Sequence, residues 1–208
     1  MAHLSSVIIP NKSLHIFDLG NVLYKVDARL SMAALEKLGM PHLDGPVSNS
    51  HAAGGVFGPY CDGLVSTDDF ISGVREMCHL NPGTSDAQIV EAWDAMLIGF
   101  DRDSIETVRQ VRAQGHKVAL LSNCNELHAA HCREEFARLF PGYGAFDSQF
   151  DKVFFSQEIK MSKPVPATWQ LVLEAMGVSA SDAAFYDDSP INTAQAEALG
   201  VKSVLFCL

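Results

Sequence analysis

The sequence lacks the features of several protein classes. Its five cysteines contain no C-x-x-C pair, and an odd, scattered set is neither a disulfide framework nor a zinc-finger spacing. No apolar run approaches the roughly 20 residues of a membrane-spanning helix. The N-terminal MAHLSSVIIPNKS has no basic segment of the kind that begins a secretory signal. We therefore expect a protein of a reducing compartment, the cytoplasm, with no membrane partner.

Basic residues are also scarce. Lysine and arginine total 15 against 25 aspartates and glutamates, which gives a net charge of -10. Because such a field repels polyanions, nucleic acid is excluded as an expected partner. A small anionic substrate would need local attraction from a metal ion, a lysine or a helix N-terminus.

Short apolar runs recur along the chain and are typical of buried strands. They are LHIF at 14–17, VALL at 118–121, VFF at 153–155, AAFY at 183–186 and SVLF at 203–206. Helical patterns over 126–140, 166–176 and 192–199 separate the later runs. This alternation predicts an α/β fold with a doubly wound, Rossmann-like parallel sheet, in which ligands bind beyond the carboxyl ends of the strands.

The segment between the first two predicted strands is far longer than one crossover requires. Helical patterns at 28–38, 67–78 and 85–97 predict a helical cap domain, residues 27–99, inserted into a core of 1–26 and 100–208. Ser66 or Thr67 is the expected N-cap of the second helix. A further helix over 104–114 would return the chain to the sheet. The stretch 45–63, rich in glycine, is predicted to be a loop whose tip could face a ligand.

Polar side chains follow the predicted strands, at the edge where parallel strands place their ligands. They are Asp18, Ser122 with Asn123, Lys163, and Asp187 with Asp188. Three converging carboxylates would repel one another unless a hard cation such as Mg²⁺ bridged them. A lysine and a hydroxyl beside them complete a phosphate cradle, in which Asp18 could attack phosphorus.

Four motifs carry a family resemblance: FDLGNVL from Phe17, LLSN from Leu120, KP at Lys163 and FYDDSPIN from Phe185. In this order they resemble the motifs of haloacid-dehalogenase-superfamily hydrolases. DLGNV, LSNCNELH and, in the insertion, DGLVSTDDF and WDAML resemble the sugar-phosphatase branch that includes alpha-D-glucose-1-phosphate phosphatase. The resemblance covers nearly all of the chain after residue 13.

The resemblance implies a role for each matching residue. Asp18 would be the nucleophile that forms an aspartyl-phosphate, and Ser122 and Lys163 would hold phosphoryl oxygens. Mg²⁺ would be ligated by Asp18, the Gly20 carbonyl and Asp188, with Asp187 and Asn192 in or near the outer shell. Gly20, Asn21 and Asn123 are expected to contact the substrate. In the insertion, His51, Tyr60 and Asp62 are candidates for touching a sugar, although a solvated loop is the favoured interpretation for each.

The chain departs from the family pattern in two places. Most phosphatases of the superfamily carry a second aspartate where this chain has Gly20, and such general acid-base help is worth about 10²- to 10⁴-fold in rate. Its absence favours a substrate with an easy leaving group, such as a sugar 1-phosphate. Before Lys163 the usual G-x-R-K-P run is replaced by KMSKP, so that Lys160 competes for the phosphate role. We expect Lys163 to fill it.

Two histidines lie three residues apart in the predicted helix, His128 and His131, and we assign them no metal because no fourth ligand accompanies them. His128 could still reach the mouth of the crevice. Trp93 and Met96 are expected to pack between helices of the insertion.

These features predict a Mg²⁺-dependent phosphatase, a monomer or homodimer, acting on a small phosphorylated metabolite such as a sugar phosphate. A metal-independent 2-haloacid dehalogenase is the first alternative, and the Asp187–Asp188 pair argues against it. A non-catalytic ligand-binding protein of the same fold is the second.

Overall fold

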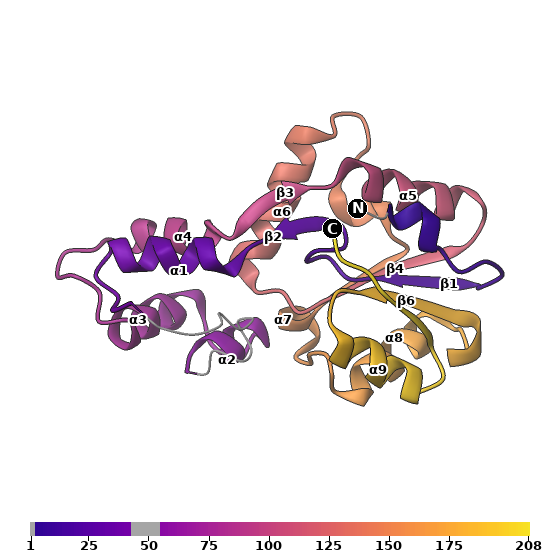
Figure 1. Cartoon of the computed structure of the whole chain (residues 1–208). Coiled ribbons are helices and arrows are strands. Elements are labelled where there is room, and N and C mark those ends of the chain that lie inside the picture. The colour runs from indigo at the N-terminus through magenta and orange to yellow at the C-terminus, as the bar shows by residue number, and fades with distance from the viewer. Residues whose placement is uncertain (1–2, 43–54) are drawn as a thin grey trace.

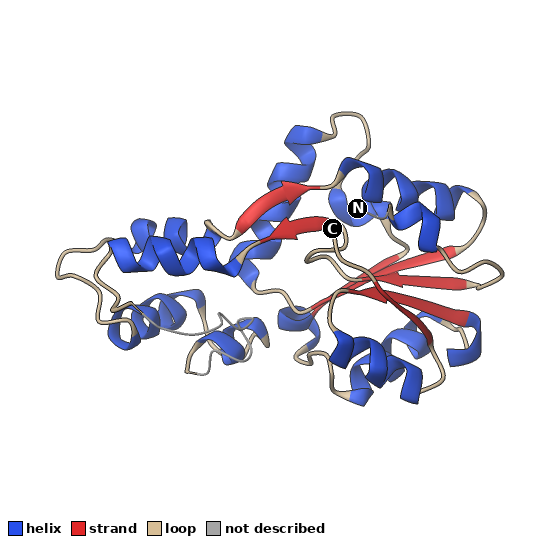
Figure 2. Ribbon diagram, viewed as in Figure 1, coloured by secondary structure: helices blue, strands red, loops and turns tan. Residues whose placement is uncertain are grey.

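The computed structural model describes residues 3–42 and 55–208. Within them, five strands form one parallel sheet in the order β5-β4-β1-β6-β7. The strands are β1 (Leu14–Phe17), β4 (Lys117–Ser122), β5 (Lys152–Phe155), β6 (Ala183–Asp187) and β7 (Lys202–Leu205). Figure 2 shows helices on both faces of this sheet. The predicted α/β fold class is confirmed.

The alternation of side chains along β1 explains why the whole strand is buried. Leu14 and Ile16 belong to the apolar cluster that includes Trp169 of α8 (Pro166–Met176). Phe17 belongs to the cluster on the other face, which includes side chains of α5 (Arg102–Ala113) and α6 (Glu126–Leu139). A strand covered on both faces is apolar at nearly every position, as the sequence pattern indicates. The last helix, α9 (Pro190–Ala198), lies beside α8 (Figure 1).

Four helices between β1 and β4 pack around a separate apolar cluster, to one side of the sheet (Figure 1). They are α1 (Ala28–Lys37), α2 (Phe57–Cys61), α3 (Thr67–Met77) and α4 (Asp86–Asp94). The Trp93 ring lies 5.2 Å from the rings of both Phe57 and Phe70, which confirms its packing between helices. Ser66 caps α3 as expected, accepting a hydrogen bond from the Asp69 amide.

A two-stranded antiparallel ribbon leads into and out of these helices, and the sequence patterns did not predict it. It consists of β2 (Tyr24–Val26) and β3 (Leu97–Phe100). The helix expected over 85–97 is therefore too long, since α4 ends at Asp94 and the chain extends to pair with β2. The proposed boundary between residues 99 and 100 falls inside β3, and the division into core and cap remains a prediction.

Several short elements complete the described part of the fold. They are α7 (Ser156–Ile159), which was not predicted, and three 3-10 turns at Leu4–Val7, Phe146–Gln149 and Ala180–Asp182. The stretch expected to be a loop, 45–63, contains α2 in its described part, which corrects that expectation. Within 3–42 and 55–208, no helix has the length and apolar character that crossing a bilayer requires.

A buried histidine on β1 makes stability depend on pH. His15 is 1% exposed and its Nδ1 lies 2.9 Å from the Tyr186 hydroxyl. Burial, with His116 nearby, lowers the pKa of His15 from 6.5 to about 4. The fold therefore needs the neutral ring, so the stability is complete above the unfolded pKa and is lost as the pH falls from 6.5 towards 4.

We expect the free energy of unfolding to fall between pH 7 and pH 5 by about 2 kcal/mol more in the wild type than in His15→Gln, because glutamine does not titrate there. Urea unfolding of both proteins at the two pH values measures this difference. Equal losses in the two proteins would show that His15 does not carry the effect.

Candidate active site

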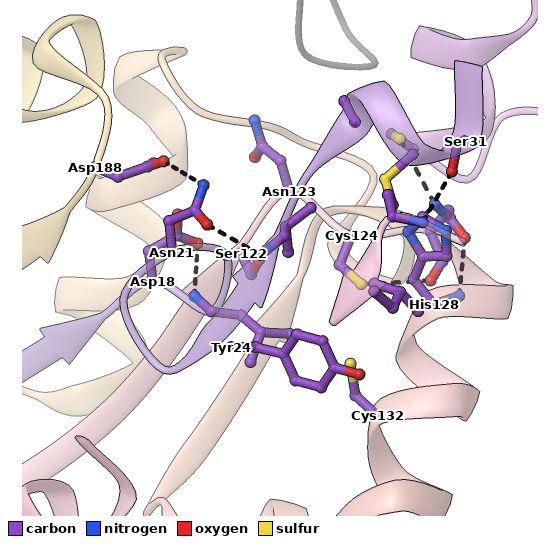
Figure 3. A pocket seen from close by; sticks show the side chains of 18 of the residues that line it. Asp18, Asn21, Tyr24, Ser31, Ser122, Asn123, Cys124, His128, Cys132 and Asp188 are labelled. Carbon is purple, nitrogen blue, oxygen red and sulfur yellow. Dashed lines mark hydrogen bonds between the residues drawn. The ribbon is translucent and has the colours of Figure 1, made fainter. Parts of the chain in front are cut away.

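The polar residues predicted at the strand ends meet at one edge of the sheet, around a buried lysine. The Lys163 Nζ lies 2.9 Å from Asp18 Oδ1 and 2.6 Å from Asp187 Oδ2, and the whole residue is 3% exposed. Asp18 follows β1, Ser122 ends β4 and Asp188 follows β6 (Figure 3). Lys163 comes from the loop between α7 and α8, so four separate segments assemble the site.

The two adjacent aspartates have different roles in this network. Both oxygens of Asp187 are engaged: Oδ1 accepts from the Ser189 amide at 2.8 Å and the Asn192 side chain at 3.0 Å, and Oδ2 accepts from Lys163. Asp187 is fully buried and does not line the cavity described below. Asp187 therefore holds the lysine, whereas Asp18 and Asp188 face the cavity.

A tight loop after Asp18 positions Asp188. Asn21 adopts a left-handed backbone (φ 54°), a conformation that asparagine tolerates better than most residues. Its side-chain amide donates to Asp188 Oδ2 at 3.0 Å, and its Oδ1 accepts from the Val26 amide at 3.0 Å (Figure 3). A Cβ added at Gly20 would meet nothing closer than Val26 Cγ2 at 3.9 Å, so packing does not require glycine there.

Asn123 fixes the backbone of Lys163 from both sides. Its side-chain amide donates to the Lys163 carbonyl at 2.8 Å, and its Oδ1 accepts from the Lys163 amide at 2.9 Å. The competing Lys160 is exposed, and its Nζ donates to the Gly63 carbonyl away from the carboxylates. The structure thus places Lys163, and not Lys160, at the strand ends.

Negative charge exceeds positive charge in this site. Burial, reinforced by Asp187 and Asp188 and opposed by Lys163, raises the pKa of Asp18 to about 7. Burial also raises the pKa of Asp188. Carboxylate oxygens of the three aspartates lie within 4.8 Å of one another. An all-oxygen donor set with uncompensated negative charge fits a hard divalent cation such as Mg²⁺.

A cavity of about 330 Å³ extends from these residues towards the inserted helices. At the sheet it is lined by Asp18, Gly20, Asn21, Ser122, Asn123, Lys163 and Asp188. Its opposite wall includes Met32 and Leu35 of α1, Phe57 of α2 and Trp93 of α4. A small molecule that reached Asp18 would therefore also contact the insertion.

Two of the three candidates for sugar contact in the insertion, Tyr60 and Asp62, do not line this cavity. The Tyr60 side chain is 1% exposed and stacks on Phe70 at 4.0 Å, so it is part of the helical core, which corrects its expected contact with substrate. Asp62, at the end of α2, is likewise absent from the lining. His51 lies outside the described residues.

His128, which was expected to reach no further than the mouth of the crevice, lines the cavity. Its ring stacks on Trp93 at 4.9 Å, and its Nδ1 lies 3.1 Å from Asn125 Nδ2. Burial lowers the pKa of His128 to about 3, so the ring is neutral. Asn125 caps α6 by accepting from the His128 amide, and this Asn-x-x-His cap directly after a strand is a signal that could have identified both residues.

The comparison with protein-family models identifies the family. The model of haloacid dehalogenase-like hydrolases matches residues 13–200. The chain belongs to the haloacid dehalogenase-like hydrolases. It is therefore a hydrolase, and the resemblance predicted from its four motifs is confirmed.

Relatives within the family include phosphatases. The chain is 24% identical, over 90% of its length and 88% of the relative's, to the D-ribitol-5-phosphate phosphatase of Bacteroides thetaiotaomicron. It is 27% identical to the magnesium complex of a HAD family enzyme from the same organism, with a TM-score of 0.84 over 95% and 94% of the two chains. A complex of that enzyme with magnesium and inorganic phosphate has a TM-score of 0.76 at 28% identity, over 93% of each chain.

The similarity of this chain to a dehalogenase is a similarity of fold only. The L-2-haloacid dehalogenase of Xanthobacter autotrophicus has a TM-score of 0.59 at 14% identity, over 92% of this chain and 76% of that one.

Proposed function

We propose that this hydrolase is a Mg²⁺-dependent phosphatase that cleaves a small phosphomonoester through an aspartyl-phosphate on Asp18. The observation that carries the proposal is the buried Lys163, held between Asp18 and Asp187 at the strand ends. A buried cation beside a carboxylate nucleophile serves to neutralise the phosphoryl oxygens that would otherwise repel that nucleophile. The solved phosphate complex of a similar enzyme supports the same assignment.

The chemistry follows from the contacts of Asp18. Its Oδ1 accepts from Lys163 and from the Leu19 amide at 2.8 Å, which leaves Oδ2 for attack. That oxygen would form a bond to phosphorus as the bond from phosphorus to the leaving alcohol oxygen breaks, and the alkoxide would take a proton from water. A water would then hydrolyse the aspartyl-phosphate, releasing inorganic phosphate and restoring the carboxylate. Lys163 and Ser122 would hold phosphoryl oxygens throughout.

The residues that would hold the ion are Asp18, the Gly20 carbonyl and Asp188. Asp187 would remain outside its coordination, because its oxygens already bind Lys163, Ser189 and Asn192. When bound, Mg²⁺ would neutralise phosphoryl charge and compensate the excess of carboxylates. Asp187 would then lie in the outer shell of the ion, as the family resemblance implies.

The substrate class to test first is a phosphorylated sugar or polyol, which is what the name of the Bacteroides relative indicates for that enzyme. The dehalogenase alternative receives less support, because carboxylates beside the nucleophile would repel a departing halide.

We expect the wild type to release phosphate from phosphomonoesters in Mg²⁺, to stop in EDTA and to recover when Mg²⁺ is restored. Asp188→Asn should raise the Mg²⁺ concentration for half-maximal rate by about 10- to 100-fold, since it removes a charged ligand. Colorimetric phosphate release across a Mg²⁺ titration measures both effects.

The matched control is Asp103→Asn, at an aspartate that is 70% exposed and lies on α5. The Mg²⁺ concentration for half-maximal rate should be the same in this variant as in the wild type. Hydrolysis that persists in EDTA, or an unchanged Mg²⁺ requirement in Asp188→Asn, would contradict the proposal.

A further inference from the structure

Among the residues that the structure describes, the wall of the cavity that faces Asp18 is mainly apolar. It is formed by Met32, Leu35, Phe57, Trp93, Met96 and Leu97. These side chains come from α1, α2, α4, the turn after α4 and the start of β3, and all lie on the inserted side of the cavity. In a phosphomonoester whose phosphoryl group sits at Lys163, the alcohol part would meet this wall.

The polar side chains among the lining residues on this side are already committed to protein partners. The Ser31 hydroxyl donates to the Trp93 carbonyl at 2.6 Å and accepts from the Met96 amide at 3.0 Å. The Tyr24 hydroxyl donates to Glu135 at 2.6 Å. Because these polar groups already have hydrogen-bond partners, a ligand hydroxyl that lost its hydrogen bonds to water would gain few from them.

Asn125 and His128 are likewise hydrogen-bonded to each other. Asn125 Oδ1 accepts from the His128 amide at 3.0 Å, and its amide nitrogen faces the ring Nδ1. Among the described residues, His128 Nε2 and Trp93 Nε1 accept or donate no hydrogen bond, and Asp94 Oδ1 lies 3.5 Å from His128 Nε2. Both nitrogen atoms are buried, and the two rings stack face to face with each other. The surface that the stacked pair contributes is mainly aromatic carbon.

We propose that the substrate's alcohol part is an alkyl or aryl group, and that the enzyme discriminates against polyols of the same size. This inference rests on the proposed phosphatase function. Against the described side chains of the apolar wall, a polyol would give up hydrogen bonds to water without replacement, whereas an apolar group would gain from leaving water. The cavity therefore favours a different substrate from the one that the relative's name indicates.

Pentyl phosphate and ribitol 5-phosphate test this preference, since both are primary phosphates on a chain of the same carbon number. We expect kcat/KM to be at least about tenfold higher for pentyl phosphate, a factor within the range that hydrophobic pockets achieve. The neighbouring hydroxyl makes ribitol the better leaving alcohol, so intrinsic reactivity does not produce this result.

Met32→Gln places a polar side chain of similar size on the apolar wall. We expect it to lower the preference for pentyl phosphate about tenfold, mainly through a higher KM. Leu30→Gln is the matched control: it lies on the same helix, is 44% exposed and does not line the cavity, so its preference should equal that of the wild type.

The outcomes separate the two proposals. If ribitol 5-phosphate is hydrolysed with equal or higher kcat/KM, the inference about the alcohol part is overturned and the phosphatase function stands. If Met32→Gln and Leu30→Gln change the preference equally, the wall does not determine it and the inference is likewise overturned. If folded wild type releases no phosphate from either compound or from a sugar-phosphate panel in Mg²⁺, both proposals fail.

Discussion

Replacing Asp18 with asparagine is expected to lower kcat for phosphate release by at least about 10³-fold. The carboxylate lies at the end of a buried strand, with one oxygen held by Lys163 and the Leu19 amide. Asparagine has nearly the same shape, but its amide is a poor nucleophile towards phosphorus. The loss should therefore appear in kcat, and the fold should survive.

Steady-state phosphate release in saturating Mg²⁺ measures this loss, and urea unfolding of the same sample checks the fold. Because burial opposes the charged form of Asp18, as its pKa of about 7 indicates, the neutral asparagine should not destabilise the protein strongly. Asp103→Asn, the same type of substitution at an exposed aspartate, is again the control. A kcat of Asp18→Asn within tenfold of the wild-type kcat would show that Asp18 is not the nucleophile.

The second large effect is expected at Lys163. Lys163→Met keeps nearly the length of the side chain but removes the positive charge between Asp18 and Asp187. We expect a lower kcat and a higher KM together, with kcat/KM reduced by about 10²- to 10³-fold, since electrostatic stabilisation of the phosphoryl group is lost. Without Mg²⁺ the free energy of unfolding should also fall by about 3 kcal/mol, because a buried carboxylate loses its partner.

Lys160→Met is the control, at the exposed lysine that lies three residues earlier and donates to Gly63. It should change kcat/KM less than threefold and stability by no more than about 1 kcal/mol. Kinetics at several substrate concentrations and urea titrations in EDTA measure the two variants side by side. A larger loss of activity in Lys160→Met than in Lys163→Met would reverse the assignment of the two lysines.

The sheet and the residues at its edge follow from the sequence for clear physical reasons. Buried parallel strands are short, continuous apolar runs, and their carboxyl ends share one edge, so Asp18, Ser122 and Asp188 could be predicted to meet. Helix α8 could be bounded to the residue because Pro166 occupies its first turn and Gly177 its end.

Other features depend on contacts that no local pattern contains. Strands β2 and β3 are short and pair across the whole insertion, so their residues alone resemble helix ends or loop. Whether Asp187 or Asp188 binds the lysine depends on the path of α9, which brings Asn192 to Asp187. Tyr60 lies in a glycine-rich stretch and is buried by Phe70 of α3, a tertiary contact that overrides the loop signal.

The apolar wall of the cavity likewise could not be predicted from local sequence patterns. Met32, Phe57 and Trp93 could each be recognised as core residues, but only the packing of three helices places them opposite Asp18. Family resemblance identifies the catalytic edge of the sheet, while the substrate's alcohol part depends on this packing.

The central claim is that the phosphoryl group passes through Asp18, and acid quenching during turnover tests it most directly. Because Gly20 offers no side chain to activate the attacking water, we expect the aspartyl-phosphate to break down slowly enough to accumulate. Peptide mapping by mass spectrometry of wild type quenched in Mg²⁺ with substrate should find one phosphoryl group on Asp18, absent from Asp18→Asn and from wild type quenched in EDTA. Turnover with no phosphoryl group on Asp18, or with one on another residue, would contradict the account.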